Sequence, residues 1–203
     1  MKKYAVLHEP GDIVTLAGTR FVVLDVERRG SLPDSLFLLA LESVGASEFG
    51  SSNNYAESDL KKAVDKWLED MGKRGLDNAK LIPREIDLTT LDGSGCYGKL
   101  SVKAAPLTLD EAREYADIIP NAERWCWLAT GWSGPSKSDG DLALYVRSSG
   151  DWYSANCSRS FGIRPALKAP SILFEDSEAG LDLSKIPTDD LLQEIHRRLA
   201  EKA

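Results

Sequence analysis

Hydrophobic and polar positions in the first forty residues follow the pattern of β-strands. Two apolar runs, residues 14–16 and 21–26, flank Ala17 and Gly18, and glycine accepts the positive φ that a tight turn needs. These runs predict an antiparallel hairpin. The wholly apolar run at 36–41 fits a buried third strand, although periodicity alone leaves a helix open there.

Two later segments have helical periodicity. Residues 58–74 carry an apolar stripe and begin with Ser58, a good N-cap. The stripe consists of Leu60, Ala63, Val64, Trp67, Leu68 and Met71. A second helix is predicted from Thr108, which forms a capping box with Glu111, to Pro120, which cannot continue a helix. Its expected buried stripe is Leu109, Ala112, Tyr115, Ala116 and Ile119.

From about residue 124 the pattern again alternates with a period of two. The apolar Leu142, Leu144 and Val146 are expected to face the core, which would leave Tyr145 and Arg147 pointing outward.

A further alternating run covers residues 161–167. It contains Arg164, which is predicted to be structural because a guanidinium can tie several loop carbonyls or a carboxylate together. Pro165 is expected on an edge or at a strand end, since proline cannot donate to a ladder.

The chain is predicted to form one α+β domain, residues 1–172, followed by an appendage. Residues 173–186 are rich in acidic and small residues and are interpreted as a linker. Residues 187–203 are predicted to form an amphipathic helix that packs on its own domain, on a second copy of the chain or on another protein such as a phage structural partner. Its apolar stripe is Leu191, Leu192, Ile195 and Leu199.

Composition and charge narrow the functional classes. The 203 residues include 25 Lys and Arg against 32 Asp and Glu, a net charge of −7. This balance argues against a nucleic-acid partner and against docking on an anionic membrane. No apolar run reaches the roughly 18–20 residues of a membrane span, and the run near the N-terminus is too short for a signal peptide. The expected location is therefore the cytoplasm on synthesis, and a virion thereafter if the protein assembles into one.

Motifs for cofactors, metals or catalysis are weak. Residues 93–98 match the bare dinucleotide fingerprint, but a strand-like run follows where a helix is needed, so a glycine loop is expected. Residues 138–141 predict a turn between strands, since the remaining ligands of a calcium loop are missing. The two histidines lie near opposite ends of the chain, and the three cysteines, 30 and 31 residues apart, are expected to be buried free thiols. No catalytic residue, metal ligand or cofactor is predicted.

The region between residues 129 and 160 has the composition of a binding surface. Ser, Gly, Trp, Tyr and Asn make up 17 of its 32 residues, as in antibody paratopes, where rigid aromatics combine with adaptable polar groups. The predicted ligand contacts are Trp132, Tyr145, Arg147, Asp151, Trp152, Tyr153 and Asn156. The alternative is that the aromatics, Trp125, Trp127 and Trp152 among them, belong to the core.

Several motifs resemble those of a family of bacterial and phage domains. They are Trp125-Cys126-Trp127-Leu128, Leu144-Tyr145-Val146-Arg147 and the closing Gly162-Ile163-Arg164-Pro165-Ala166-Leu167. That family is similar to the C-type-lectin-like superfamily of formylglycine-generating enzymes and retroelement-diversified variable proteins. The resemblance covers about residues 10–168 and implies a C-type-lectin-like fold with two helices and short, mostly antiparallel sheets. Cys157 lacks the neighbouring cysteine that the oxidase chemistry of those enzymes uses.

The preferred hypothesis is a non-catalytic module that binds a protein or carbohydrate, encoded by a phage or prophage and used in host contact or virion assembly. The alternatives are a structural protein whose aromatics are all core, and a cryptic enzyme of the formylglycine-generating kind. A binding module is expected to expose Trp132, Trp152 and Tyr153 on one face. An enzyme is expected to show a deep pocket with convergent titratable groups.

Overall fold

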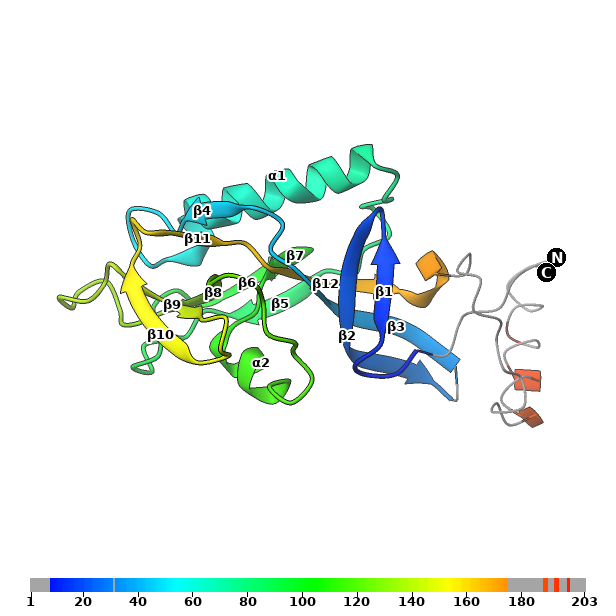
Figure 1. The fold of residues 1–203 in the computed structure, drawn as a ribbon. Helices are drawn as coiled ribbons and strands as arrows, with labels where there is room; N and C mark the ends of the chain where they lie inside the picture. The colour runs from blue at the N-terminus through cyan, green and yellow to red at the C-terminus, as the bar shows by residue number, and fades with distance from the viewer. Residues whose placement is uncertain (1–7, 31, 175–187, 190–191, 194–196, 198–203) are drawn as a thin grey trace.

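The computed structural model describes residues 8–30, 32–174, 188–189, 192–193 and 197. Within these residues the fold is α+β, with two five-stranded sheets and one two-stranded sheet (Figure 1). The strand order in the first sheet is β1 (Ile13–Leu16), β2 (Thr19–Arg29), β3 (Leu32–Ala40), β12 (Pro165–Pro170), β7 (Ala104–Pro106). The order in the second is β10 (Trp152–Asn156), β9 (Leu142–Val146), β8 (Cys126–Gly131), β11 (Ser160–Gly162), β4 (Ala46–Glu48). The short sheet pairs β5 (Arg84–Asp87) with β6 (Lys99–Val102), and the β11–β8 pair is parallel whereas the other pairs are antiparallel.

The predicted N-terminal hairpin is confirmed. β1 and β2 pair around Ala17 and Gly18, whose φ angles of 46° and 75° are those of the mirror-image turn that suits twisted strands. The apolar run at 36–41 lies largely in β3, so the strand interpretation is confirmed and the helical alternative is wrong. Leu36 and Leu38 are fully buried between the first sheet and the rest of the core.

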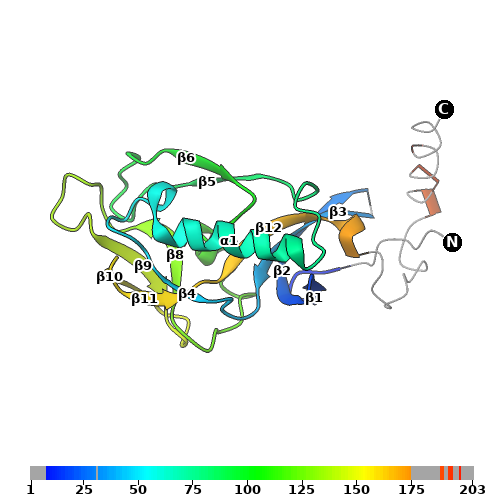
Figure 2. The same cartoon turned by 90° about the horizontal axis from the view of Figure 1, so that it is seen from above.

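The first predicted helix is confirmed as α1 (Asp59–Lys73). Ser58 caps it by accepting a hydrogen bond from the Lys61 amide at 2.9 Å, and the apolar stripe packs on the large core cluster. α1 contacts β4 of the second sheet and β7 of the first, and the two views show it lying along both sheets (Figures 1 and 2). It therefore ties the two sheets together.

The second predicted helix is confirmed at its start but not in its length. Thr108 and Glu111 form the capping box of α2 (Leu109–Glu114). The helix ends there because the chain turns at Tyr115, whose carbonyl accepts from the amides of both Ile118 and Ile119. The predicted extension to Pro120 is therefore wrong, and Ala116 is exposed, not buried.

β9 has buried residues on both of its faces, which overturns one prediction about this strand. Leu144 packs in a small core cluster together with residues of α2, whereas Ala143 and Tyr145 pack in the large cluster on the opposite face. Tyr145 is only 5% exposed, so the expectation that it faces outward is wrong. The outward position is covered because Phe161 of β11 and Trp127 of β8 contact the Tyr145 ring.

The Arg164 side chain is buried and bonds two main-chain carbonyls. Its Nε donates to the carbonyl oxygen of Ala40 at 2.7 Å, and its Nη1 donates to that of Pro120 at 2.9 Å. The side chain thus ties the end of β3 to the segment that follows α2. Pro165 is the first residue of β12, in agreement with its predicted place at a strand end.

The glycine-rich segment at 93–98 is a loop between β5 and β6, and a strand follows it, as predicted. Its Tyr97 hydroxyl donates to Oδ1 of the buried Asn53 at 2.6 Å. The Asn53 amide in turn donates to the carbonyls of Ser133 and Leu142, each at 2.9 Å. The loop is therefore held against the turn at 138–141, which connects β8 and β9 as expected.

The expected C-terminal appendage lies largely outside the described residues. A short 3-10 helix, η2 (Ser171–Phe174), ends the continuous part, and the Phe174 side chain is buried. Of the predicted stripe, Leu192 is exposed, while Leu191, Ile195 and Leu199 lie outside the described residues. The linker and the docking helix stay predictions.

Candidate functional site

The predicted ligand contacts are divided between the two faces of the second sheet. Trp152 and Tyr153 are neighbours on β10, and successive side chains of a strand point to opposite faces. Trp152 lines a pocket together with Val146, whereas the Tyr153 ring contacts Tyr145 on the other face. Trp132 is half-buried and packs against the small core cluster. The three aromatics are therefore not exposed together on one face.

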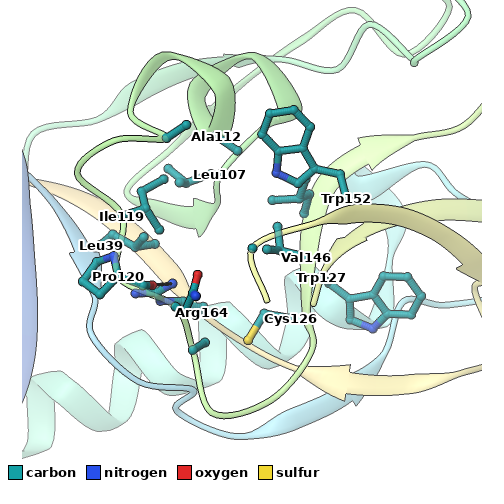
Figure 3. A pocket seen from close by; sticks show the side chains of 15 residues that line it. Leu39, Leu107, Ala112, Ile119, Pro120, Cys126, Trp127, Val146, Trp152 and Arg164 are labelled. Carbon is teal, nitrogen blue, oxygen red and sulfur yellow. Dashed lines mark hydrogen bonds between the residues drawn. The ribbon is translucent and has the colours of Figure 1, made fainter. Parts of the chain in front are cut away.

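The Trp152 side of the sheet contains an apolar pocket. It is a cavity of about 90 Å³ between β8, β9, β10 and the segment that runs from α2 to Ala122 (Figure 3). Its apolar walls include Leu39, Leu107, Ile119, Leu128 and Val146. We call this cavity the Arg164 pocket.

Trp152 lies at the mouth of the Arg164 pocket, beside Ala112 of α2, and is 39% exposed (Figure 3). The guanidinium of Arg113, also on α2, lies 5.6 Å from the centre of the Trp152 ring. This cation–π contact joins α2 to β10 across the opening. Trp152 is thus neither a free loop tip nor a core residue.

Arg164 lines the same pocket on the side away from Trp152 (Figure 3). The residue is only 7% exposed, and its Nη2 has no hydrogen-bond partner among the residues that the structure describes. Burial lowers the pKa of Arg164 from its ordinary value, but a guanidinium remains protonated in proteins. The pocket therefore combines apolar walls with one buried cation.

The thiols divide into two buried groups and one exposed group. Cys126 lines the Arg164 pocket, and burial raises the pKa of its thiol to about 11 and that of Cys157 to about 12. Cys96 is exposed in the glycine loop, so the prediction that all three thiols are buried is wrong for this residue. Within the described part of the chain, no group of three His, Cys, Asp or Glu side chains could hold a metal ion.

These pKa shifts predict selective thiol labelling. At pH 8 we expect a thiol-specific chromogenic reagent to modify one thiol per folded chain, because the raised pKa values and burial keep Cys126 and Cys157 protonated and inaccessible. In 6 M guanidinium chloride all three should react. A Cys96→Ser variant should show no fast labelling, and rapid modification of two or three thiols in the folded protein would contradict the burial.

The opposite face of the second sheet carries an exposed aromatic surface, formed by Trp125, Arg147 and Tyr153. The Arg147 guanidinium lies 3.6 Å from the centre of the Tyr153 ring and 5.1 Å from that of Trp125. Trp125 and Tyr153 are 41% and 44% exposed. The sequence-based list of contacts contains Arg147 and Tyr153 but misses Trp125, whose neighbourhood is set by Tyr145 and Phe161 from distant segments.

Asp151 and Asn156 shape turns at the ends of β10. The Asp151 carboxylate accepts from the Ser149 hydroxyl at 2.8 Å, and the Asn156 amide donates to the Asp141 carboxylate. Both residues are exposed, but neither lines the Arg164 pocket or joins the aromatic surface.

Another concave region has charged walls, and four of its charged side chains form two ion pairs. Arg84 donates to the Glu111 carboxylate and to the carbonyls of Ala105 and Pro106, and Lys168 donates to the Glu27 carboxylate. These bonds hold α2, β5 and β7 together. We therefore assign this region to the structure and not to a ligand.

We find no family model, curated protein or solved structure that matches the chain. None of the helices formed by the described residues is long and apolar enough to span a membrane. Functional inference therefore depends on the geometry of the Arg164 pocket and of the aromatic surface.

Proposed function

We propose that the chain is a non-catalytic ligand-binding module with C-type-lectin-like architecture, encoded by a phage or prophage, and that it acts in host contact or virion assembly. The two helices, the mostly antiparallel sheets and the closing strand that begins at Pro165 are compatible with that architecture. The resemblance of residues 162–167 to the closing strand of the phage and bacterial family supports the proposed source. The Arg164 pocket is the proposed binding site.

The observation that carries this proposal is an apolar pocket whose mouth is formed by a partly exposed tryptophan. Ligand sites are typically concave and apolar, with a few polar groups that fix orientation. The ionisable groups of the pocket favour binding over catalysis: the guanidinium of Arg164 stays protonated, and the Cys126 thiol has a pKa of about 11. Neither group exchanges protons readily near neutral pH.

The test is a fragment screen by two-dimensional NMR on the full chain. We expect small apolar fragments to shift the signals of Ala112, Val146 and the Trp152 indole. The Trp152→Ala variant should lose about thirtyfold in affinity, the loss typical of a binding hot spot. Ile13→Ala, on an exposed position of the first sheet, is the control and should leave binding unchanged. A screen in which no fragment shifts the pocket signals would contradict the proposal.

The aromatic surface supports a second candidate, recognition of a protein or carbohydrate on the opposite face of the same sheet. Trp, Tyr and Arg are the residues enriched in binding hot spots, and here the guanidinium of the half-buried Arg147 contacts the exposed rings of Trp125 and Tyr153. A glycan or protein array probed with the wild type and with Tyr153→Ala tests this candidate. Binding that the folded Tyr153→Ala variant retains in full would exclude it.

A further inference from the structure

We propose that β10 binds an extended segment of a partner protein as an additional antiparallel strand, and that this segment carries an acidic residue opposite Tyr153 and an apolar residue opposite Trp152. The inference rests on the proposed function, because it names the kind of partner that the binding module takes between the Arg164 pocket and the aromatic surface. Its basis is an edge strand whose outward main-chain groups lie between two exposed aromatic rings.

β10 is the outermost strand of the second sheet, next to β9 (Figure 1). The two strands pair without a bulge, so every second residue of β10 bonds to β9. The Asp151 carbonyl accepts from the Arg147 amide at 2.9 Å, and the β9-facing bond of Cys157 at the other end has the same phase. The N–H and C=O groups of Trp152 and Ser154 therefore point away from β9, and none of the other described residues forms a hydrogen bond with them.

The other edges of the two large sheets are shorter. β4 and β7 have three residues each and β1 has four, against five in β10. The Ser47 carbonyl of β4 already accepts from the Trp127 indole. In β7, Arg84 donates to the carbonyls of Ala105 and Pro106. Natural proteins protect edge strands with proline, lysine or a bulge, and β10 has none of these, so it is the longest unprotected edge of the two sheets.

The two faces of β10 set the side-chain chemistry of the added segment. In an antiparallel pair, opposite side chains share a face and their Cβ atoms lie about 4.5–5.5 Å apart. A residue opposite Tyr153 therefore reaches the guanidinium of Arg147, which lies 3.6 Å from the centre of the Tyr153 ring. No carboxylate of the described residues lies within ion-pair distance of Arg147, so an acidic residue at this position complements its charge. The next residue lies opposite Trp152, where an apolar side chain covers the exposed part of the indole at the mouth of the Arg164 pocket.

A second copy of the chain fits this edge less well. The antiparallel register with the longest overlap is centred on the middle of β10, and it places Ala155 of the second copy opposite Tyr153. This register offers Arg147 no carboxylate, and it sets the polar Asn156 against Trp152. The contacts therefore favour a segment with a different sequence.

The experiment uses a synthetic peptide of the proposed pattern, acetyl-Ser-Thr-Thr-Glu-Leu-Thr-amide, titrated into the full chain at pH 7 and followed by two-dimensional NMR. We expect the amide signals of β10 to shift. With Glu opposite Tyr153, the peptide Leu exchanges main-chain hydrogen bonds with Trp152, whereas the Glu amide points away from β10. N-methylation of the Leu amide should therefore weaken binding at least tenfold, and N-methylation of the Glu amide should change it less than twofold.

Replacement of the peptide Glu by Gln tests the charge. The wild-type chain should bind the Gln peptide about threefold more weakly, as expected for a partly exposed ion pair. The difference between the two peptides should vanish in the Arg147→Gln variant.

Ser154→Pro serves as the blocking variant. Proline removes an outward N–H that β9 does not use, and its ring occupies the edge. This variant should weaken peptide binding at least tenfold. Thr15→Pro on β1 is the matched control, because Val23 bonds to Asp12 at 2.8 Å and Thr15, three residues later, also turns its N–H outward. It should leave peptide binding unchanged. Melting curves check that both variants fold, and the N-methylated peptides give the answer on the wild-type chain if Ser154→Pro unfolds.

The outcomes separate this inference from the proposed function. Absence of peptide binding, equal weakening by the two N-methylations, or full binding by a folded Ser154→Pro variant would overturn the added strand. A Glu preference that is absent, or that Arg147→Gln retains, would overturn the acidic pattern and with it the inference. A wild-type chain that light scattering shows to be a dimer, with Ser154→Pro a monomer, would assign the edge to a second copy and overturn the inference as well. In each case fragments that still shift the signals of the Arg164 pocket would keep the proposed function, and a failed fragment screen would overturn it.

Discussion

We expect the Arg164→Ala variant to lose about 3–5 kcal/mol of unfolding free energy, the usual cost of removing one partner from a buried charged interaction. The substitution leaves the carbonyls of Ala40 and Pro120 without their donors. It also removes the connection between the end of β3 and the segment after α2. A loss of this size is a large part of the 5–15 kcal/mol that stabilises a typical domain.

Urea unfolding followed by circular dichroism measures this effect. Arg159→Ala is the matched control, because Arg159 is exposed in the turn between β10 and β11 and should cost less than about 0.5 kcal/mol. The loss of unfolding free energy for Arg164→Lys should lie between those for Arg164→Ala and Arg159→Ala, since a single ammonium cannot reproduce a planar fork of donors. If Arg164→Ala unfolded at the same urea concentration as the wild type, the structural role of this residue would be wrong.

Elements with a local signal were predictable from the sequence. The turn at Ala17 and Gly18, the Ser58 cap of α1 and the Thr108 capping box each depend on residues a few positions apart, and the structure confirms each of them. The length of α2 was not predictable in this way. The apolar residues after Glu114 keep a helical spacing, but Ile118 and Ile119 belong to turns closed on the Tyr115 carbonyl.

The candidate site shows a second limit of prediction from the sequence. The aromatic and polar composition of residues 129–160 drew attention to β9 and β10, but composition cannot assign a face. The adjacency of Trp152 and Tyr153 was a usable signal, because neighbours on a strand point in opposite directions. The burial of Tyr145 and the walls of the Arg164 pocket could not be predicted, since they depend on contacts with α2, β3 and β11 from distant parts of the chain.

Trp127→Ala is the second substitution with a large expected effect, a loss of about 3–5 kcal/mol of unfolding free energy. Trp127 is 1% exposed and its indole contacts the rings of Phe49, Tyr145 and Phe161, with centroid distances of 5.5, 6.2 and 4.6 Å. Its Nε1 donates to the Ser47 carbonyl at 3.0 Å, which links β8 to β4. Alanine would leave a cavity in the large core cluster and an unpaired carbonyl beside it.

Two comparisons divide this loss into its parts. Trp127→Phe keeps most of the ring contacts but loses the indole donor, so it should cost about 1–3 kcal/mol, the range for leaving a buried polar group unpaired. Trp125→Ala is the matched control two residues earlier: it removes a ring that is 41% exposed and should cost about 1 kcal/mol, mainly through lost stacking on Tyr145. Urea unfolding curves of the three variants give the order of their losses of unfolding free energy. Equal losses for Trp125→Ala and Trp127→Ala would contradict the central position of Trp127 in the core.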